Sequence, residues 1–118
     1  MNILPRAYEA IIPIEKFTLY SLNPDGDFDK HLAFERALGY NLSNCQGLID
    51  NIRENITKYP AQPKEDKGHG LRYEILMDLT GPNGKTASVL TAWIDDNKTG
   101  DMRLTSAYVK KRKGDSGD

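Results

Sequence analysis

Residues 71–94, LRYEILMDLTGPNGKTASVLTAWI, decide the fold of this chain. Apolar and polar side chains alternate through Leu71–Leu79, and this period of two is typical of a strand with one buried face. The turn residues Gly81-Pro82-Asn83-Gly84 follow, and a second strand-like run continues to Ile94, so the segment predicts a β-hairpin. A two-residue turn at Asn83-Gly84 and a four-residue loop over Gly81–Gly84 give the same pairing parity: both place odd-numbered residues of the first strand opposite even-numbered residues of the second.

That parity predicts which side chains share a face of the sheet. The apolar odd-numbered side of the first strand is joined by Leu90, Ala92 and Ile94. The opposite face then carries a mixed cationic, acidic and aromatic group, made of Arg72, Glu74, Thr91 and Trp93. Because a solvated face needs no tryptophan, we expect a ligand on this side of the hairpin.

Two amphipathic helices are expected before the hairpin. Asp27 or Asp29 can cap a helix that runs to about Leu38, with Gly39 as its left-handed stop. Ser43 and Gln46 form a capping box for a second helix over about residues 44–57. A short helix is also expected over residues 15–21, after an edge strand or extended segment at residues 11–14.

The segments around the hairpin complete the expected fold. Residues 59–70 contain prolines, glycines and charges and predict a flexible loop. Residues 101–109 predict a third strand, with Met102, Leu104 and Tyr108 toward the core and Arg103 and Thr105 on the face of Trp93 and Arg72. Helices followed by an antiparallel meander of three or four strands indicate an α+β fold, with N-terminal helices packed on a small sheet.

Length and composition bound the class of protein. The chain has 118 residues, which suffice for one domain with its own core. We expect an N-terminal arm over residues 1–13, a single α+β domain over 14–110, and a basic, disordered tail over 111–118. A net charge of -1 with a pI near 6.1 gives no global attraction to nucleic acid or to an anionic membrane.

Cysteine and hydropathy patterns exclude several kinds of site. The single cysteine, Cys45, excludes an internal disulfide and a multi-cysteine zinc site, and it suits a reducing cytoplasm. No phosphate-binding loop or metal motif is present, so we expect no cofactor and no metal. No signal peptide or membrane span is found, so we expect a cytoplasmic site of action, no membrane partner, and export only as part of a larger protein.

Several segments resemble a known domain family. They are LNP at 22–24, KHLAFERALGY at 30–40, GLRY at 70–73, TGPNGKT at 80–86, TAWI at 91–94 and RLTSAYVK at 103–110. Together they are similar to an uncharacterised domain at the C-terminal tips of bacterial polymorphic and contact-dependent toxins, which also occurs as small stand-alone proteins. Its layout is similar to the barnase, EndoU, colicin and RelE group of ribonuclease toxins.

The resemblance implies a metal-independent ribonuclease. The family's helix lysine matches Lys30, its strand-entry Gly-x-Arg-Tyr matches residues 70–73, and its last-strand threonine matches Thr105 or Ser106. The acidic stretch Asp25–Asp29 replaces the usual glycine-rich lead. RNA, including transfer RNA, is the implied substrate, and a cognate immunity protein or antitoxin the implied partner.

Metal-free RNA cleavage needs a base, an acid and cations for the phosphorane charge. His31 and His69 are the only histidines, and imidazole has an ordinary pKa of about 6.5. We expect them to share acid and base roles, with Lys30 at the phosphate and Thr105 positioning substrate. Each histidine has an ordinary alternative, as an exposed helix residue for His31 and a polar loop residue for His69.

Substrate-binding residues are expected on the Trp93 face. Arg72 and Arg103 suit bidentate phosphate binding, although Arg72 could equally form a surface ion pair with Glu74 or Asp95. Trp93 either stacks a base or covers a small second core. Thr91 and Tyr108 complete the expected set, with the Tyr108 hydroxyl at the rim of the core. The alternative function is a non-catalytic interaction module, phage or mobile-element encoded, that docks on a protein through the Trp93 face.

Overall fold

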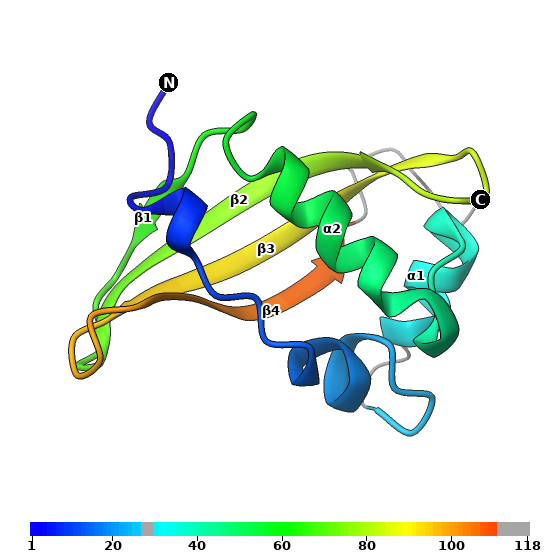
Figure 1. Cartoon of the computed structure of the whole chain (residues 1–118), viewed down its shortest axis with the longest axis horizontal. Coiled ribbons are helices and arrows are strands. Elements are labelled where there is room, and N and C mark those ends of the chain that lie inside the picture. Colours follow the sequence, from blue (N-terminus) through cyan, green and yellow to red (C-terminus); the bar gives the residue numbers. More distant parts are fainter. Residues whose placement is uncertain (27–29, 111–118) are drawn as a thin grey trace.

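The computed structural model describes residues 1–26 and 30–110 and shows an α+β fold (Figure 1). An antiparallel sheet carries the strand order β1-β2-β3-β4 within this part of the chain. The strands are β1 (Gln62–Lys64), β2 (Gly70–Thr80), β3 (Thr86–Asp96) and β4 (Met102–Val109). The helices are η1 (Ala7–Glu9), η2 (Phe17–Ser21), α1 (Lys30–Leu38), η4 (Leu42–Asn44) and α2 (Cys45–Asn55). Within the described ranges, no helix is long and apolar enough to cross a membrane.

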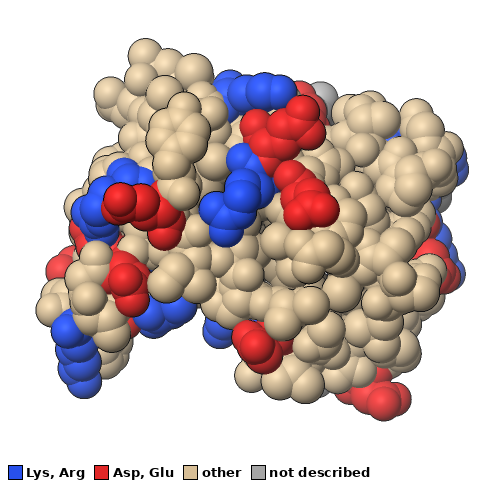
Figure 2. Space-filling view, in the orientation of Figure 1, with Lys and Arg blue, Asp and Glu red and all other residues tan. Residues whose placement is uncertain are grey.

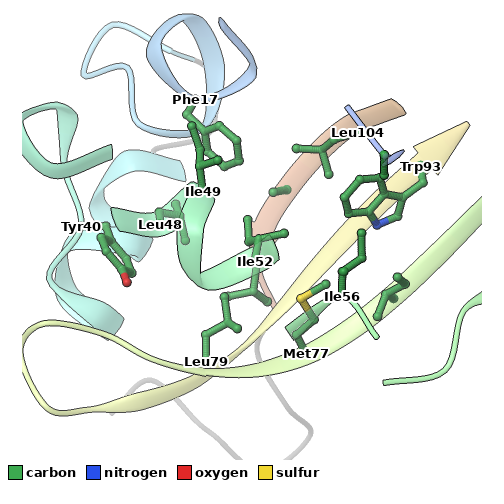
Figure 3. Packing of buried hydrophobic residues seen from close by; sticks show 14 of the residues in the cluster. Phe17, Tyr40, Leu48, Ile49, Ile52, Ile56, Met77, Leu79, Trp93 and Leu104 are labelled. Carbon is green, nitrogen blue, oxygen red and sulfur yellow. The ribbon is translucent and has the colours of Figure 1, made fainter. Parts of the chain in front are cut away.

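The core lies between α2 and one face of the sheet (Figures 1 and 3). The apolar residues of α2 recur at helical spacing, as predicted, and they include Leu48, Ile49 and Ile52. They pack with Met77 and Leu79 of β2 and with residues of β3 and β4. Removing this apolar surface from water is the main term that stabilises the fold.

The hairpin forms as predicted, but the predicted register is wrong. Gly84 N donates to Gly81 O and Gly81 N donates to Lys85 O, so the loop between paired residues is the three-residue Pro82-Asn83-Gly84. Gly84 adopts a φ of 83°, as the left-handed position of a three-residue hairpin loop requires. An odd loop length reverses the parity, so Tyr73 pairs with Trp93 and Leu76 with Leu90.

The change of register moves two predicted surface residues into the core. Trp93 and Thr91 are both 0 % exposed and share the face of Ile75. The prediction of Leu90, Ala92 and Ile94 on the core face is wrong for the same reason. Leu90 is only 7 % exposed, yet it lies outside the core cluster.

A β-bulge in β4 decides the position of Tyr108. Ala92 pairs with Ser106 and Trp93 with Leu104, which leaves Thr105 as the extra residue. Leu104 is therefore buried in the core as predicted, but beyond the bulge it is Ala107 that points inward. The prediction that Tyr108 faces the core is wrong, because the bulge turns it to the opposite face.

The remaining segments differ from prediction in smaller ways. The expected loop over residues 59–70 contains β1, which pairs antiparallel with β2. The N-terminal arm packs into the core through Leu4, Ala7 and Ala10, and Ile11 bridges to Arg103 at the edge of β4. The predicted helix caps Asp27 and Asp29, and the predicted tail over 111–118, lie outside the described residues.

The local helix signals are largely confirmed. Gly39 ends α1 with a φ of 85°, in the left-handed conformation predicted for it. The predicted capping box of Ser43 and Gln46 is wrong, because the N-cap of α2 is Asn44, which has no side-chain cap, and the capping box is formed before it by Asn41, the N-cap of η4, and Asn44. Ser43 contributes to this cap by donating its backbone N–H to Asn41 Oδ1 at 2.9 Å.

Candidate functional site

The sheet face opposite the core carries Arg72, Arg103 and Tyr108 of the predicted site residues. We call it the second face. The pleat directs alternate side chains of β2, β3 and β4 to this side. Its main members are Arg72, Glu74, Leu76, Leu90, Ala92, Ile94, Arg103, Ser106 and Tyr108. Leu76 is 44 % exposed, which is high for a leucine in the middle of a strand.

Two arginines of the second face lie in one cross-strand row. Arg72 pairs with Ile94, and Ile94 pairs with Arg103 on its other side. We call these three residues the arginine row, and Lys64 of β1 extends it because it pairs with Arg72. Arg72 and Arg103 therefore share one face of the sheet, as predicted, and Ile94 lies between them.

The partners of these cations differ. Arg72 Nε donates to Glu65 O at 2.8 Å, and among the described residues Arg72 has no carboxylate partner. Arg103 Nη2 lies 2.9 Å from Asp96 Oδ2, and Lys64 Nζ lies 3.7 Å from Glu74 Oε1. The ion pair considered for Arg72 with Glu74 or Asp95 is thus not formed, and the Arg72 guanidinium keeps donors for a ligand.

Two predicted site residues, Lys30 and Tyr108, meet where α1 packs against β4 (Figure 1). Lys30 Nζ lies 5.8 Å from the centroid of the Tyr108 ring, within the range of a cation–π contact. His31 follows Lys30 and is half-buried; its Nδ1 is shielded from solvent and has no hydrogen-bond partner among the described residues. We call Lys30, His31 and Tyr108 the α1–β4 cluster.

A buried imidazole nitrogen without a partner is costly and needs an explanation. His31 shares the inward stripe of α1 with Phe34 and Leu38, three and seven residues further along, so the ring is held against the core. The exposed-helix alternative considered for His31 therefore does not describe its Nδ1. Nδ1 is therefore enclosed by the protein, and a ligand can reach it only if the ring or its neighbours move.

The two histidines are not brought together. His69 is exposed and precedes β2, where its carbonyl oxygen accepts from Asn97 N at 3.1 Å. Tyr108 lies on the row of Leu76, six residues further along β2 than Gly70. At about 3.3 Å per residue, the two ends are about 20 Å apart. His69 and His31 therefore cannot act on the same phosphodiester in this arrangement.

Trp93 and Thr91 serve the core in place of a ligand. Trp93 Nε1 donates to Thr91 Oγ1 at 2.8 Å, and Thr91 Oγ1 donates to Ile75 O at 3.0 Å. Both polar groups are thus satisfied inside the protein, and neither can touch a substrate. Thr105 is half-buried at the bulge and donates to Ala92 O at 3.2 Å, so its hydroxyl holds the bulge.

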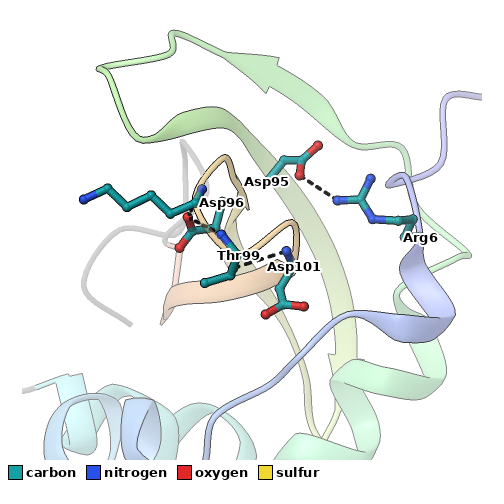
Figure 4. A network of polar contacts seen from close by, with 6 residues as sticks. Arg6, Asp95, Asp96, Thr99 and Asp101 are labelled. Atoms are coloured by element: carbon teal, nitrogen blue, oxygen red, sulfur yellow. Dashed lines mark hydrogen bonds and ion pairs between the residues drawn. The ribbon is translucent and has the colours of Figure 1, made fainter.

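The network in Figure 4 closes the end of the sheet near the arginine row. Arg6 Nη2 lies 2.6 Å from Asp95 Oδ1, which ties the N-terminal arm to β3. Asp96 accepts from the backbone N–H of Lys98, and this bond together with Arg103 lowers the pKa of its carboxyl group below the ordinary value. The carboxylate is therefore charged at neutral pH and holds Arg103 in place.

Charges on the helix side do not form a competing site. In Figure 2, which views the molecule from the side of α2, basic and acidic side chains are interspersed, with no area of one sign. Residues 1–26 and 30–110 contain no group of three or more His, Cys, Asp or Glu side chains placed to hold a metal ion.

Sequence reasoning missed Lys64 as a member of the site. Its segment contains Pro63 and many polar residues, and it is paired with β2 over only three residues. A three-residue strand carries too little alternation to be distinguished from a loop. No local signal could have placed Lys64 beside Arg72, because only the pairing does so.

The comparisons identify a family for the chain. Searches of curated proteins and of solved structures found no match. A family model described as a domain of unknown function, DUF6883, matches residues 3–111. This match includes the arm, both helices α1 and α2, and all four strands. The chain therefore belongs to the DUF6883 family.

Proposed function

We propose that this protein is a metal-independent endoribonuclease of the bacterial toxin type. The observation that carries the proposal is the contact between Lys30 and Tyr108, which joins the N-terminal end of α1 to β4, with His31 as the next residue of the helix. An ammonium group, an imidazole and a phenol are the kinds of group that metal-free RNA cleavage requires. The resemblance of residues 14–110 to toxin domains supports the same reaction class.

In this proposal the reaction is an internal transfer. His31 takes the proton of the ribose 2′-hydroxyl, whose oxygen attacks phosphorus and forms a 2′,3′-cyclic phosphate. Tyr108 gives its hydroxyl proton to the departing 5′-oxygen, and Lys30 stabilises both the phosphorane charge and the phenolate that Tyr108 leaves behind. His31 then passes its proton through water to the Tyr108 phenolate, which restores both side chains to their starting states. Thr105 positions β4, and His69 has no part in the chemistry.

The substrate is cellular RNA, with transfer RNA as the first candidate from the toxin resemblance. Such an enzyme acts in the cytoplasm of the cell it attacks. A producing cell then needs a cognate immunity protein or antitoxin that blocks the α1–β4 cluster or the second face. Both partners belong to the proposal and depend on the same reaction.

Incubation of the purified protein with total RNA in EDTA tests this function. We expect cleavage without divalent ions, products that end in a 2′,3′-cyclic phosphate, and a bell-shaped dependence of rate on pH. His31→Ala should lower kcat/KM by about 10²–10⁴-fold. His69→Ala is the matched control and should retain full activity. Intact RNA at every pH, or equal losses in the two variants, would overturn the assignment.

A non-catalytic docking module is the second candidate. The observation in its favour is the exposed Leu76 on a face where Lys64 is already paired with Glu74 and Arg103 with Asp96. Trp93, the anchor first expected for such a module, is buried and cannot contribute. A wild-type protein that leaves RNA intact, and that binds the protein encoded beside its gene until Leu76→Glu is introduced, would favour this candidate.

A further inference from the structure

We infer that the second face binds an unpaired RNA strand in two separate zones. The α1–β4 cluster holds the phosphodiester that is cleaved, and the arginine row anchors the same strand about 13 Å away. This inference rests on the proposed function and deepens it, because it names the substrate class as single-stranded RNA. It also separates RNA binding by the second face from RNA cleavage, so an experiment can reject either one without rejecting the other.

The anchoring zone is preorganised for phosphate. Arg72 and Arg103 flank Ile94 on neighbouring strands, so their Cα atoms are about 10 Å apart. Glu65 O holds Arg72 through Nε, and Asp96 holds Arg103 through Nη2. A guanidinium group has five donor hydrogens, so each arginine keeps several for phosphate oxygens. Fixing the two side chains in advance reduces the entropy lost on binding.

The distance between the zones sets a minimum length for the substrate. Arg72 and Leu76 are four residues apart along β2, and Leu76 is on the row of Leu90 and Tyr108. Four residues of strand correspond to about 13 Å. One phosphodiester group cannot contact both zones, so a dinucleotide can occupy only one of them. A longer strand can contact both.

Apolar and aromatic groups within the two zones favour unpaired bases. Leu76 is exposed, Ile94 is half-buried within the arginine row, and the half-buried Tyr108 presents an aromatic ring at the far end. Splayed bases of a single strand can pack on apolar and aromatic side chains, whereas a duplex stacks its bases internally and presents mainly phosphates and hydroxyls. A duplex would therefore leave Leu76 and Ile94 without a partner.

The test compares a dinucleotide with a 12-nucleotide single-stranded RNA. Arg72→Gln should lower kcat/KM for the long substrate by about tenfold to a hundredfold, the usual effect of losing a charged hydrogen-bonding partner. It should leave kcat/KM for the dinucleotide unchanged. Lys58→Gln, an exposed lysine just after α2, is the matched control and should change neither value. Equal losses on both substrates, or no loss on either, would overturn the two-zone arrangement.

Binding is measured separately with a fluorescein-labelled 2′-deoxy 12-mer, which cannot be cleaved. Arg72→Gln should weaken it and should lower the slope of log K against log salt by about 0.7, as expected for one lost phosphate contact to a single strand. A duplex of the same length that binds as tightly would overturn the inference. Binding that depends on Arg72 without any RNA cleavage would instead reject the proposed enzyme and support the binding face.

Discussion

Replacing Thr91 with valine tests the hairpin register and the burial of Trp93 together. Thr91 Oγ1 accepts a hydrogen bond from Trp93 Nε1 and donates one to Ile75 O, and both side chains are 0 % exposed. Valine has nearly the shape of threonine, so the change removes the hydroxyl without opening a cavity. The indole N–H is then left inside the core without a partner.

The expected cost follows from that unpaired donor. A buried polar group that loses its partner destabilises a protein by about 1–3 kcal/mol. With a urea dependence of about 2 kcal/mol per M, the midpoint of unfolding should fall by about 0.5–1.5 M. Thr80→Val is the matched control, because Thr80 is exposed at the end of β2. A surface change of that kind should stay within about 0.5 kcal/mol.

A double-mutant cycle isolates the hydrogen bond. Trp93→Phe removes the indole donor, so Thr91→Val should cost about 1 kcal/mol less in that background than in the wild type. Far-UV circular dichroism is the appropriate signal, because Trp93 is the only tryptophan and its fluorescence is lost in the variant. Strictly additive costs, or a Thr91→Val change no larger than that of Thr80→Val, would refute the register and the buried position of Trp93.

Three further predictions test other parts of the structure. A Cβ at Gly81 would overlap the carbonyl oxygen of Leu38, so Gly81→Ala should lower the free energy of unfolding by about 1–3 kcal/mol in chemical denaturation. Gly47→Ala in α2 is the control: its Cβ meets only an ordinary side-chain contact, so it should raise the free energy of unfolding by about 0.4–1 kcal/mol. The pKa of the Asp96 carboxyl group is lower in the folded protein than its ordinary value of 3.8, so the stabilisation that the carboxylate provides is fully present above pH 3.8 and is lost as the pH falls through the folded-state pKa. The difference in the free energy of unfolding between wild type and Asp96→Asn should therefore narrow below pH 3.8. Iodide should quench the fluorescence of Trp93 far less in the folded protein than in urea, and equal quenching would contradict its burial.

The α+β class could be predicted because its signals are local. The alternation in Leu71–Leu79, the turn residues Gly81–Gly84 and the helical spacing of Leu48, Ile49 and Ile52 each depend on a few neighbouring residues. These patterns arise from the periods of strand and helix and do not require knowledge of distant partners. The structure accordingly confirms the hairpin, α2 and the third strand of the prediction.

The site was only partly predictable, because the face on which each side chain of β3 lies depends on whether the hairpin loop has an odd or an even number of residues. The sequence of the turn is compatible with loops of two, three or four residues, and one residue of difference exchanges the two faces of β3. The hydrogen bond from Gly81 N to Lys85 O shows that the loop has three residues. This register buries Trp93 and Thr91 and places Arg72 in one cross-strand row with Ile94 and Arg103. Polar and apolar residues mix on both sides of β3, so burial alone did not reveal the register.

The sequence by itself determined β2, β3, β4, the helices α1 and α2, and the types of side chain available for chemistry, since these follow from local periodicity and composition. Only the tertiary structure decided which of them meet. The bulge at Thr105 turns Tyr108 to the second face, and the packing of α1 against β4 brings Lys30 to it. The same packing leaves His69 at the far end of the sheet. Such meetings depend on pairings between residues far apart in the chain, and no local pattern encodes them.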